Sequence, residues 1–166
     1  MNSTESSSKV NQTFDAAVSL FIQDPHKLTA RNIAKKAHNS TQPIYSYYQS
    51  VPRLHKLVAR HIVNILATLS YTIEFNSSID LAIWYFNQCP SLATEILDNN
   101  IDLLEYLTNS INQISQDTNL ITQEHLIMLA ETKYLYYTLS NNESSVVLTK
   151  SLNSLYQNLK HLVSPK

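Results

Sequence analysis

The chain has 166 residues and a formal net charge of −1, and its hydrophobic content of 43% is enough for one globular core. It contains no glycine, which excludes glycine-rich phosphate-binding loops and favours helices over hairpin-rich sheets. Its single cysteine, Cys89, excludes an intrachain disulfide, and it has no apolar run of about 20 residues for a membrane span. We therefore expect an all-α cytoplasmic protein of about nine helices, without a membrane partner.

The charges are unevenly distributed along the chain. Residues 1–62 contain eight Lys and Arg against three Asp and Glu, whereas the remaining residues contain four against ten. A basic N-terminal part on an acidic body favours a polyanionic partner for the first part alone. Chance clustering on a solvated surface is the alternative, so the residue pattern must decide.

The N-terminal pattern predicts a tail and then an amphipathic helix. Residues 1–8 are polar without an apolar core, so we expect a disordered tail and no signal peptide. A first helix is predicted over Lys9–Gln23, and Asp24-Pro25 ends it. Its apolar residues recur at helical spacing: Val10, Phe14, Ala17 and Phe21.

Two short helices separated by a turn are predicted next. Thr29 is the expected N-cap of a helix over Ala30–Ala37, and His38-Asn39 forms the turn, in which one residue needs a left-handed conformation that His and Asn tolerate. Ser40 is the candidate N-cap of a third helix from Thr41 to about Gln49.

Six further helices are predicted from apolar periodicity and turn signals. The fourth begins at Ser50 and Pro52 and fades between Tyr71 and Asn76, with the apolar stripe Leu54, Val58, Ile62, Ile65 and Leu69. A capping box at Ser77 and Asp80 begins the fifth helix, whose apolar residues are Ile79, Ile83 and Phe86. The sixth is a short helix over Ser91–Asp98. The seventh has an apolar face formed by Ile101, Leu104, Leu107, Ile111 and Ile114. A helix from Thr122 to about Leu139 is apolar nearly all round, so we expect it to be buried on most sides.

The last predicted helix carries leucines at alternating spacings of four and three, the pattern of a helix-bundle seam. We expect this seam to form a dimer interface, and it consists of Leu148, Leu152, Leu155, Leu159 and Leu162.

The helix, turn and helix at 29–49 have the chemistry of a DNA reader. A reading helix presents donors, acceptors and apolar groups to base edges, while neighbouring cations and hydroxyls grip phosphates. Gln bonds adenine in a bidentate way, and Pro or Tyr contacts a thymine methyl. The candidate DNA-contacting residues are Thr29, Arg31, Ser40, Thr41, Gln42, Pro43, Tyr45, Ser46, Tyr47 and Arg53; Lys35 and Lys36 are further phosphate candidates.

The segments 28–37 (LTARNIAKKA) and 40–48 (STQPIYSYY) resemble the helix-turn-helix of the TetR/AcrR regulators, and Phe14-Asp15-Ala16-Ala17 with Leu20-Phe21 is similar to that family's first helix. The resemblance covers about residues 10–57; His38 and Asn39 depart from it, since a Gly and an apolar residue are usual there, and a Lys often found near Val51 is absent.

The resemblance implies a homodimeric repressor on a palindromic operator, released by a small effector bound among the middle helices. It also implies base contacts at Thr41, Gln42, Pro43 and Tyr45, with Arg31 as a further candidate, and phosphate contacts at Thr29, Tyr47 and near Arg53. The expected domains are a DNA-binding part over 9–53 and a dimerisation and effector-binding part over 54–166. Candidate contacts to a hydrophobic or aromatic effector are Trp84, Tyr85, Tyr106, Tyr134 and Tyr137.

Two other functional classes stand beside this interpretation. The first alternative is a protein of the same fold that is controlled by a protein partner rather than a small ligand. The second is an enzyme, which we do not expect because the sequence has no nucleophile–base motif, paired catalytic carboxylates or phosphate loop. The six histidines show no metal-ligand spacing, so no metal or cofactor is expected.

Overall fold

The computed structural model describes residues 3–98, 100–115 and 119–140, so the predicted leucine seam lies outside the described residues. Within these ranges every regular element is a helix, which confirms the all-α prediction. The elements are α1 (Ser3–Gln23), the 3-10 helix η1 (Pro25–Lys27), α2 (Ala30–Lys36), α3 (Gln42–Tyr47), α4 (Val51–Ser70), α5 (Ser78–Gln88), α6 (Pro90–Leu97), α7 (Ile101–Ile114) and α8 (Gln123–Ser140).

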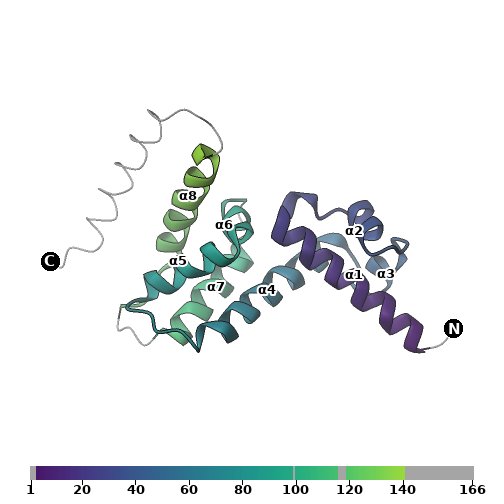
Figure 1. Cartoon of the computed structure of the whole chain (residues 1–166), viewed down its shortest axis with the longest axis horizontal. Coiled ribbons are helices and arrows are strands. Elements are labelled where there is room, and N and C mark those ends of the chain that lie inside the picture. The colour runs from purple at the N-terminus through teal and green to yellow at the C-terminus, as the bar shows by residue number, and fades with distance from the viewer. Residues whose placement is uncertain (1–2, 99, 116–118, 141–166) are drawn as a thin grey trace.

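Figure 1 shows two groups of helices that α4 connects. We call α1, η1, α2 and α3 the head, and α5 to α8 the body. Helix α4 packs against α1 and α3 of the head and against α5 and α7 of the body. The boundary expected between residues 53 and 54 therefore falls in the first turns of a helix that belongs to both groups.

The head is held together by a small, fully buried core. Phe21, Ile33 and Ile44 come from α1, α2 and α3, and each is 0% exposed. At the edge of this core the Tyr48 hydroxyl donates to the Val10 carbonyl at 3.2 Å, and the Tyr48 ring stacks on Phe14. These contacts fix the short α3 against the long α1. A helix as short as α3 is marginally stable on its own, so it depends on such tertiary contacts.

Helix α1 begins at Ser3, so the predicted disordered tail over residues 1–8 is wrong for residues 3–8. Once the packed part of a helix has formed, each added residue gains a backbone hydrogen bond without a new nucleation step. The polar residues before Lys9 include neither glycine nor proline, so nothing in the sequence stops the helix there.

Helix α4 buries a different face from the predicted stripe. Leu54, Val58 and Ile62 are buried as expected, but Ile65 is 44% exposed and Leu69 is 52% exposed. Their places in the core are taken by Val63 and Leu66. The buried face turns around the helix because α4 packs against α5 and α7 of the body as well as against α1 and α3 of the head.

The body packs α5, α6, α7 and α8 around a second group of buried residues. Leu81, Leu92, Leu107 and Leu126 come one from each helix, and none is more than 1% exposed. Ser77 caps α5 by accepting from the Asp80 N–H at 3.1 Å, as predicted. Two residues of the predicted apolar faces are solvent-facing instead, namely Ile83 and Ile101.

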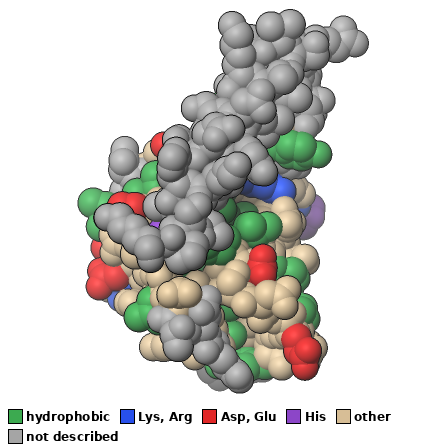
Figure 2. Space-filling view, turned by 90° about the vertical axis from the view of Figure 1, so that its left-hand side faces the viewer, with side chains coloured by type: hydrophobic (Ala, Val, Ile, Leu, Met, Phe, Trp, Pro, Cys, Tyr) green, Lys and Arg blue, Asp and Glu red, His purple; other side chains and the backbone are tan. Residues whose placement is uncertain are grey.

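Helix α8 is less enclosed than its composition predicts. Leu126, Leu129 and Ala130 are buried, chiefly against α6, whereas Tyr134 and Tyr136 are more than half exposed. Contact with the body covers one side of the helix, so the expectation of burial on most sides is not met within the described residues. Figure 2 looks onto this end of the molecule, where hydrophobic side chains lie among acidic ones. None of the described helices has the length and apolarity needed to cross a membrane.

Candidate nucleic-acid interface

Helix α3 lies between two residues with left-handed backbone conformations. His38 has φ 53° in the turn after α2, as predicted for that turn, and Gln49 has φ 67° just after α3. The helix spans Gln42–Tyr47, which is shorter than predicted. Thr41 rather than Ser40 is its N-cap, while the Ser40 hydroxyl accepts from the Gln42 N–H at 3.4 Å.

The predicted DNA-contacting side chains lie on the surface of the head or of the first turn of α4, with one exception. Thr41, Gln42, Tyr45 and Ser46 are four of the five exposed candidates on α3 and its N-cap, the fifth being Tyr47, and we call these four the recognition face. Tyr45 is 55% exposed, so much of its ring is available to a partner. The remaining exposed candidates are Thr29, Arg31, Ser40, Tyr47 and Arg53.

Pro43 is the exception, and it is buried. Its ring occupies the first turn of α3, on the side that carries the buried Ile44 into the head core. The predicted contact between Pro43 and a thymine methyl is therefore wrong for this arrangement, because the side chain is enclosed by the head itself.

The helices on either side of α3 begin with hydroxyl caps and carry the cations. Thr29 caps α2 by accepting from the Asn32 N–H at 3.3 Å, and Ser50 caps α4 by accepting from the Arg53 N–H at 3.2 Å. The Arg53 guanidinium donates to the Gln49 side chain, which holds it next to the end of α3. On α2 the exposed cations are Arg31, Lys35 and Lys36.

The described aromatics among the predicted effector contacts differ in their burial and in their partners. Trp84 and Tyr85 touch edge to face, but Tyr85 is 0% exposed within the body core. Burial raises the pKa of the Tyr85 hydroxyl, while the hydroxyls of Ser110 and Ser70 act in the opposite direction. Tyr85 is thus a packed core residue.

The other two described aromatics lie elsewhere. The Tyr106 hydroxyl donates to Asn64 on α4 at 2.6 Å, and its ring lies under Arg60. Tyr134 lines a groove of about 450 Å³ that also includes Ile22 and Pro90. Tyr106 therefore contacts α4, and Tyr134 lies beside the start of α6. The Tyr137 side chain lies outside the described part of the chain, so a shared effector pocket stays a prediction.

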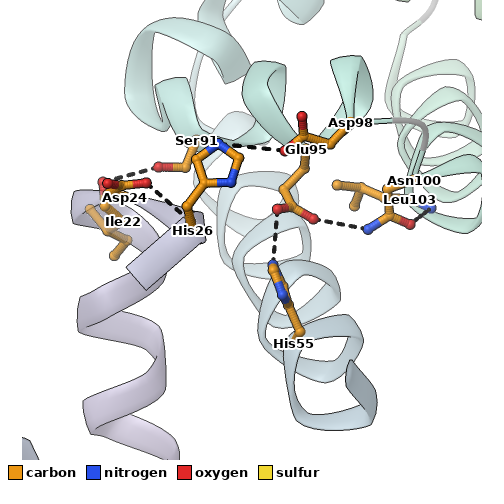
Figure 3. Close-up of polar contacts among 9 residues, drawn as sticks. All are labelled: Ile22, Asp24, His26, His55, Ser91, Glu95, Asp98, Asn100 and Leu103. Atoms are coloured by element: carbon orange, nitrogen blue, oxygen red, sulfur yellow. Dashed lines mark hydrogen bonds and ion pairs between the residues drawn. The ribbon is translucent and has the colours of Figure 1, made fainter. Parts of the chain in front are cut away.

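A polar junction between head and body was missed by sequence reasoning (Figure 3). Nε2 of His55, near the start of α4, lies 3.0 Å from Oε1 of Glu95 on α6. The second oxygen of Glu95 accepts from the Asn100 side chain at 3.0 Å, and Asn100 in turn caps α7 by accepting from the Leu103 N–H at 3.1 Å. Phe21 of the head meets the His55 ring edge to face at 5.4 Å.

Glu95 is charged at this junction although it is only 6% exposed. Burial alone raises the pKa of its carboxyl, but hydrogen bonds from His55 and Asn100 and the charge of His55 outweigh burial, so the pKa lies below its ordinary value. The carboxylate is therefore stabilised by groups from two helices, and removing either partner leaves a poorly solvated charge.

More exposed contacts surround this centre. His26 of η1 lies 3.6 Å from Asp98, and Lys56 pairs with Asp102, whose pKa is lowered by that lysine. Ser91 of α6 donates to the Ile22 carbonyl at the end of α1, at 3.1 Å. His26, Lys56, Asp98 and Asp102 line a cleft of about 610 Å³ between η1, the start of α4 and the α6–α7 corner. We call this set of contacts, with His55, Glu95 and Asn100, the junction.

No motif in the sequence marks the junction, because its head-to-body contacts, such as His55–Glu95 and Ser91–Ile22, join residues dozens of positions apart that follow no spacing rule. The one available signal is the cluster of polar residues Glu95, Asp98 and Asn100 in and after a short apolar helix. Among the described residues no group of three His, Cys, Asp or Glu side chains is arranged to hold a metal ion.

The chain matches no protein-family model, no curated protein and no solved structure.

Proposed function

We propose that this chain is a sequence-specific DNA-binding transcription regulator that contacts the major groove through α3. The observation that carries the proposal is the recognition face: a short helix, anchored in the head by buried Ile44, presents Gln42 and Tyr45 to solvent. Helices of this kind place their first turns at base edges while the preceding helix crosses the phosphate backbone.

The distribution of charge supports the same proposal. The exposed cations Arg31, Lys35 and Lys36 lie on α2, and Arg53 lies just after α3, so both flanks of the recognition face carry positive charge. The body has the opposite charge balance. A DNA duplex approaching the molecule is therefore attracted to the head and repelled by the body.

The further parts of the proposal are a homodimer on a palindromic operator and release of the operator by a small effector. Two heads related by a twofold axis read the two halves of an inverted repeat. The leucines at 148, 152, 155, 159 and 162 are the proposed dimer contacts, so Leu155→Asp is expected to yield a monomer, because an unpaired charge in an apolar seam is costly.

The test of DNA binding is equilibrium titration of labelled duplex at several salt concentrations. We expect affinity to fall steeply with salt, since neutralised phosphates release counterions. Arg31→Gln is expected to weaken binding and to reduce the salt slope by about one. Lys133→Gln removes the same charge from α8 in the body and serves as the matched control. Equal losses in the two variants, or a flat salt dependence, contradict the proposal.

A further inference from the structure

We propose that the half-sites read by this protein are rich in A·T base pairs at the positions contacted by α3. This inference rests on the proposed function and specifies the sequence class of its DNA partner. It is drawn from the chemical groups that the recognition face offers and from those that it lacks.

The recognition helix and the residues directly before and after it in the sequence carry no charged side chain. From Asn39 to Pro52 the sequence has no Lys, Arg, Asp, Glu or His. Specific contacts to guanine most often come from Arg or Lys at O6 and N7, and contacts to the cytosine amino group come from Asp or Glu. The face that would enter the groove therefore lacks the usual readers of both members of a G·C pair.

The groups present on the recognition face match an A·T pair instead. The side-chain amide of Gln42 offers a donor and an acceptor that fit N6 and N7 of adenine in a bidentate way. Gln42 is exposed in the first turn of α3, and its backbone N–H is already occupied by the Ser40 hydroxyl. The side chain is the part of this residue that remains to meet a base.

Tyr45 supplies an apolar surface of the kind that meets a thymine methyl. It lies three residues after Gln42, so it is on the same side of α3 and about one turn further along. The other two residues of the recognition face, Thr41 and Ser46, carry hydroxyls that can form hydrogen bonds with either an A·T or a G·C base pair. They therefore do not offset the preference set by Gln42 and Tyr45.

The nearby arginines are placed for phosphates rather than bases. Arg31 lies in the first turn of α2, the helix that crosses the backbone in this mode of docking. The Arg53 side chain is held by Gln49 beyond the end of α3. A guanine reader would thus have to come from outside the recognition face.

The first experiment is selection of bound duplexes from a random pool by the full chain, followed by sequencing. Enriched half-sites with A·T pairs at their centre support the inference. Enriched half-sites in which G·C pairs dominate overturn it and leave the proposed DNA-binding function standing. The absence of any enriched sequence from a folded protein overturns both.

A second selection with Gln42→Arg assigns the preference to the residue. The variant places a guanidinium on the same exposed turn, so one position of the half-site is expected to change from A·T to G·C by about tenfold or more. An unchanged motif shows that Gln42 does not read a base, and it overturns the inference. Circular dichroism and a melting curve establish that the variant is folded.

The contact of Tyr45 is tested with duplexes in which deoxyuridine replaces thymidine, because this removes the 5-methyl group and keeps the base pairing. We expect about a fourfold loss of affinity at the contacted position, the value of one buried methyl-sized group. Tyr45→Phe is expected to keep this sensitivity and Tyr45→Ala to lose it. Equal sensitivity in both variants contradicts the methyl contact.

Discussion

The recognition face and the junction use polar side chains in opposite ways. On the recognition face Gln42 and Ser46 point into solvent on a helix whose opposite side is anchored in the core. At the junction Glu95 is buried and bound by His55 and Asn100, which come from two other segments of the chain. The polar side chains of the recognition face are free to contact an external partner, whereas those of the junction form the contacts that hold head and body together.

This difference separates two kinds of mutational effect. Substitutions at the junction are expected to lower the free energy of unfolding, because they leave buried groups without partners. Substitutions on the recognition face are expected to alter DNA binding while stability stays nearly constant. The four predictions below are ordered by the expected loss in unfolding free energy.

The largest loss is expected for Phe21→Ala, on the head side of the junction. Phe21 is 0% exposed and packs edge to face on His55, so its truncation leaves a cavity and costs about 3–5 kcal/mol. Urea denaturation measures the loss. The matched control is Ile22→Ala at the adjacent, half-exposed position, for which a change within about 0.5 kcal/mol is expected. Similar losses at both positions would mean that Phe21 is not a junction anchor.

A smaller loss is expected for Glu95→Gln, which leaves His55 without its charged partner and costs about 2 kcal/mol. Asp98→Asn removes the same charge from the half-exposed pair with His26 and is expected to cost less than about 1 kcal/mol.

The pH dependence of this effect has a definite sign. Because the pKa of Glu95 in the folded protein lies below its ordinary value of 4.5, its carboxylate stabilises the fold above that value. The contribution is lost as the pH falls through the lower, folded-state pKa. The difference in stability between wild type and Glu95→Gln should therefore shrink on acidification, and a difference that grew would contradict this assignment.

Two helix caps provide a matched pair in head and body. Ser50→Ala and Ser77→Ala each remove a hydroxyl that accepts from a backbone N–H three residues on, and each is expected to cost about 1 kcal/mol. We expect Ser50→Ala alone to weaken DNA binding, since it frays the start of α4 beside Arg53. Thermal unfolding and duplex titration of both variants make the comparison, and equal loss of binding would refute it.

The smallest loss of stability is expected for Gln42→Ala, within about 0.5 kcal/mol. Its DNA affinity is nevertheless expected to fall by about 1–3 kcal/mol at one operator position, with relaxed preference there. Competition titrations with single-position variants of the selected operator measure this. A uniform loss over all sequences would show that Gln42 contacts the backbone rather than a base.

Local signals allowed the head to be predicted more accurately than the body. Thr29 and Ser77 were predicted as caps, because a cap depends on a hydroxyl and the few residues that follow it, whereas the predicted cap Ser40 was one residue away from the N-cap Thr41. The exposed residues of the recognition face were also predicted from local sequence, namely the segment 40–48. Pro43 departed from this pattern, since its burial depends on how α3 docks onto the rest of the head.

Long-range contacts were the part that periodicity did not predict. Ile65 and Leu69 have the spacing of a buried stripe, yet the helices that pack against α4 leave both side chains exposed. The hydrogen bond from Ser91 to Ile22 joins residues 69 positions apart, and no sequence pattern links them. The contact of Tyr106 with Asn64 on α4 is likewise long-range, and no spacing in the sequence predicts it.

The left-handed residues on either side of α3 have a thermodynamic consequence for binding. In a chain without glycine, His38 and Gln49 hold these conformations against their steric preference, so the surrounding fold must maintain both bends. Glycine at either position would relax the bend and also widen the range of orientations open to α3. A helix fixed by two such bends loses little conformational entropy when it docks, and more of its contact energy is then expressed as affinity.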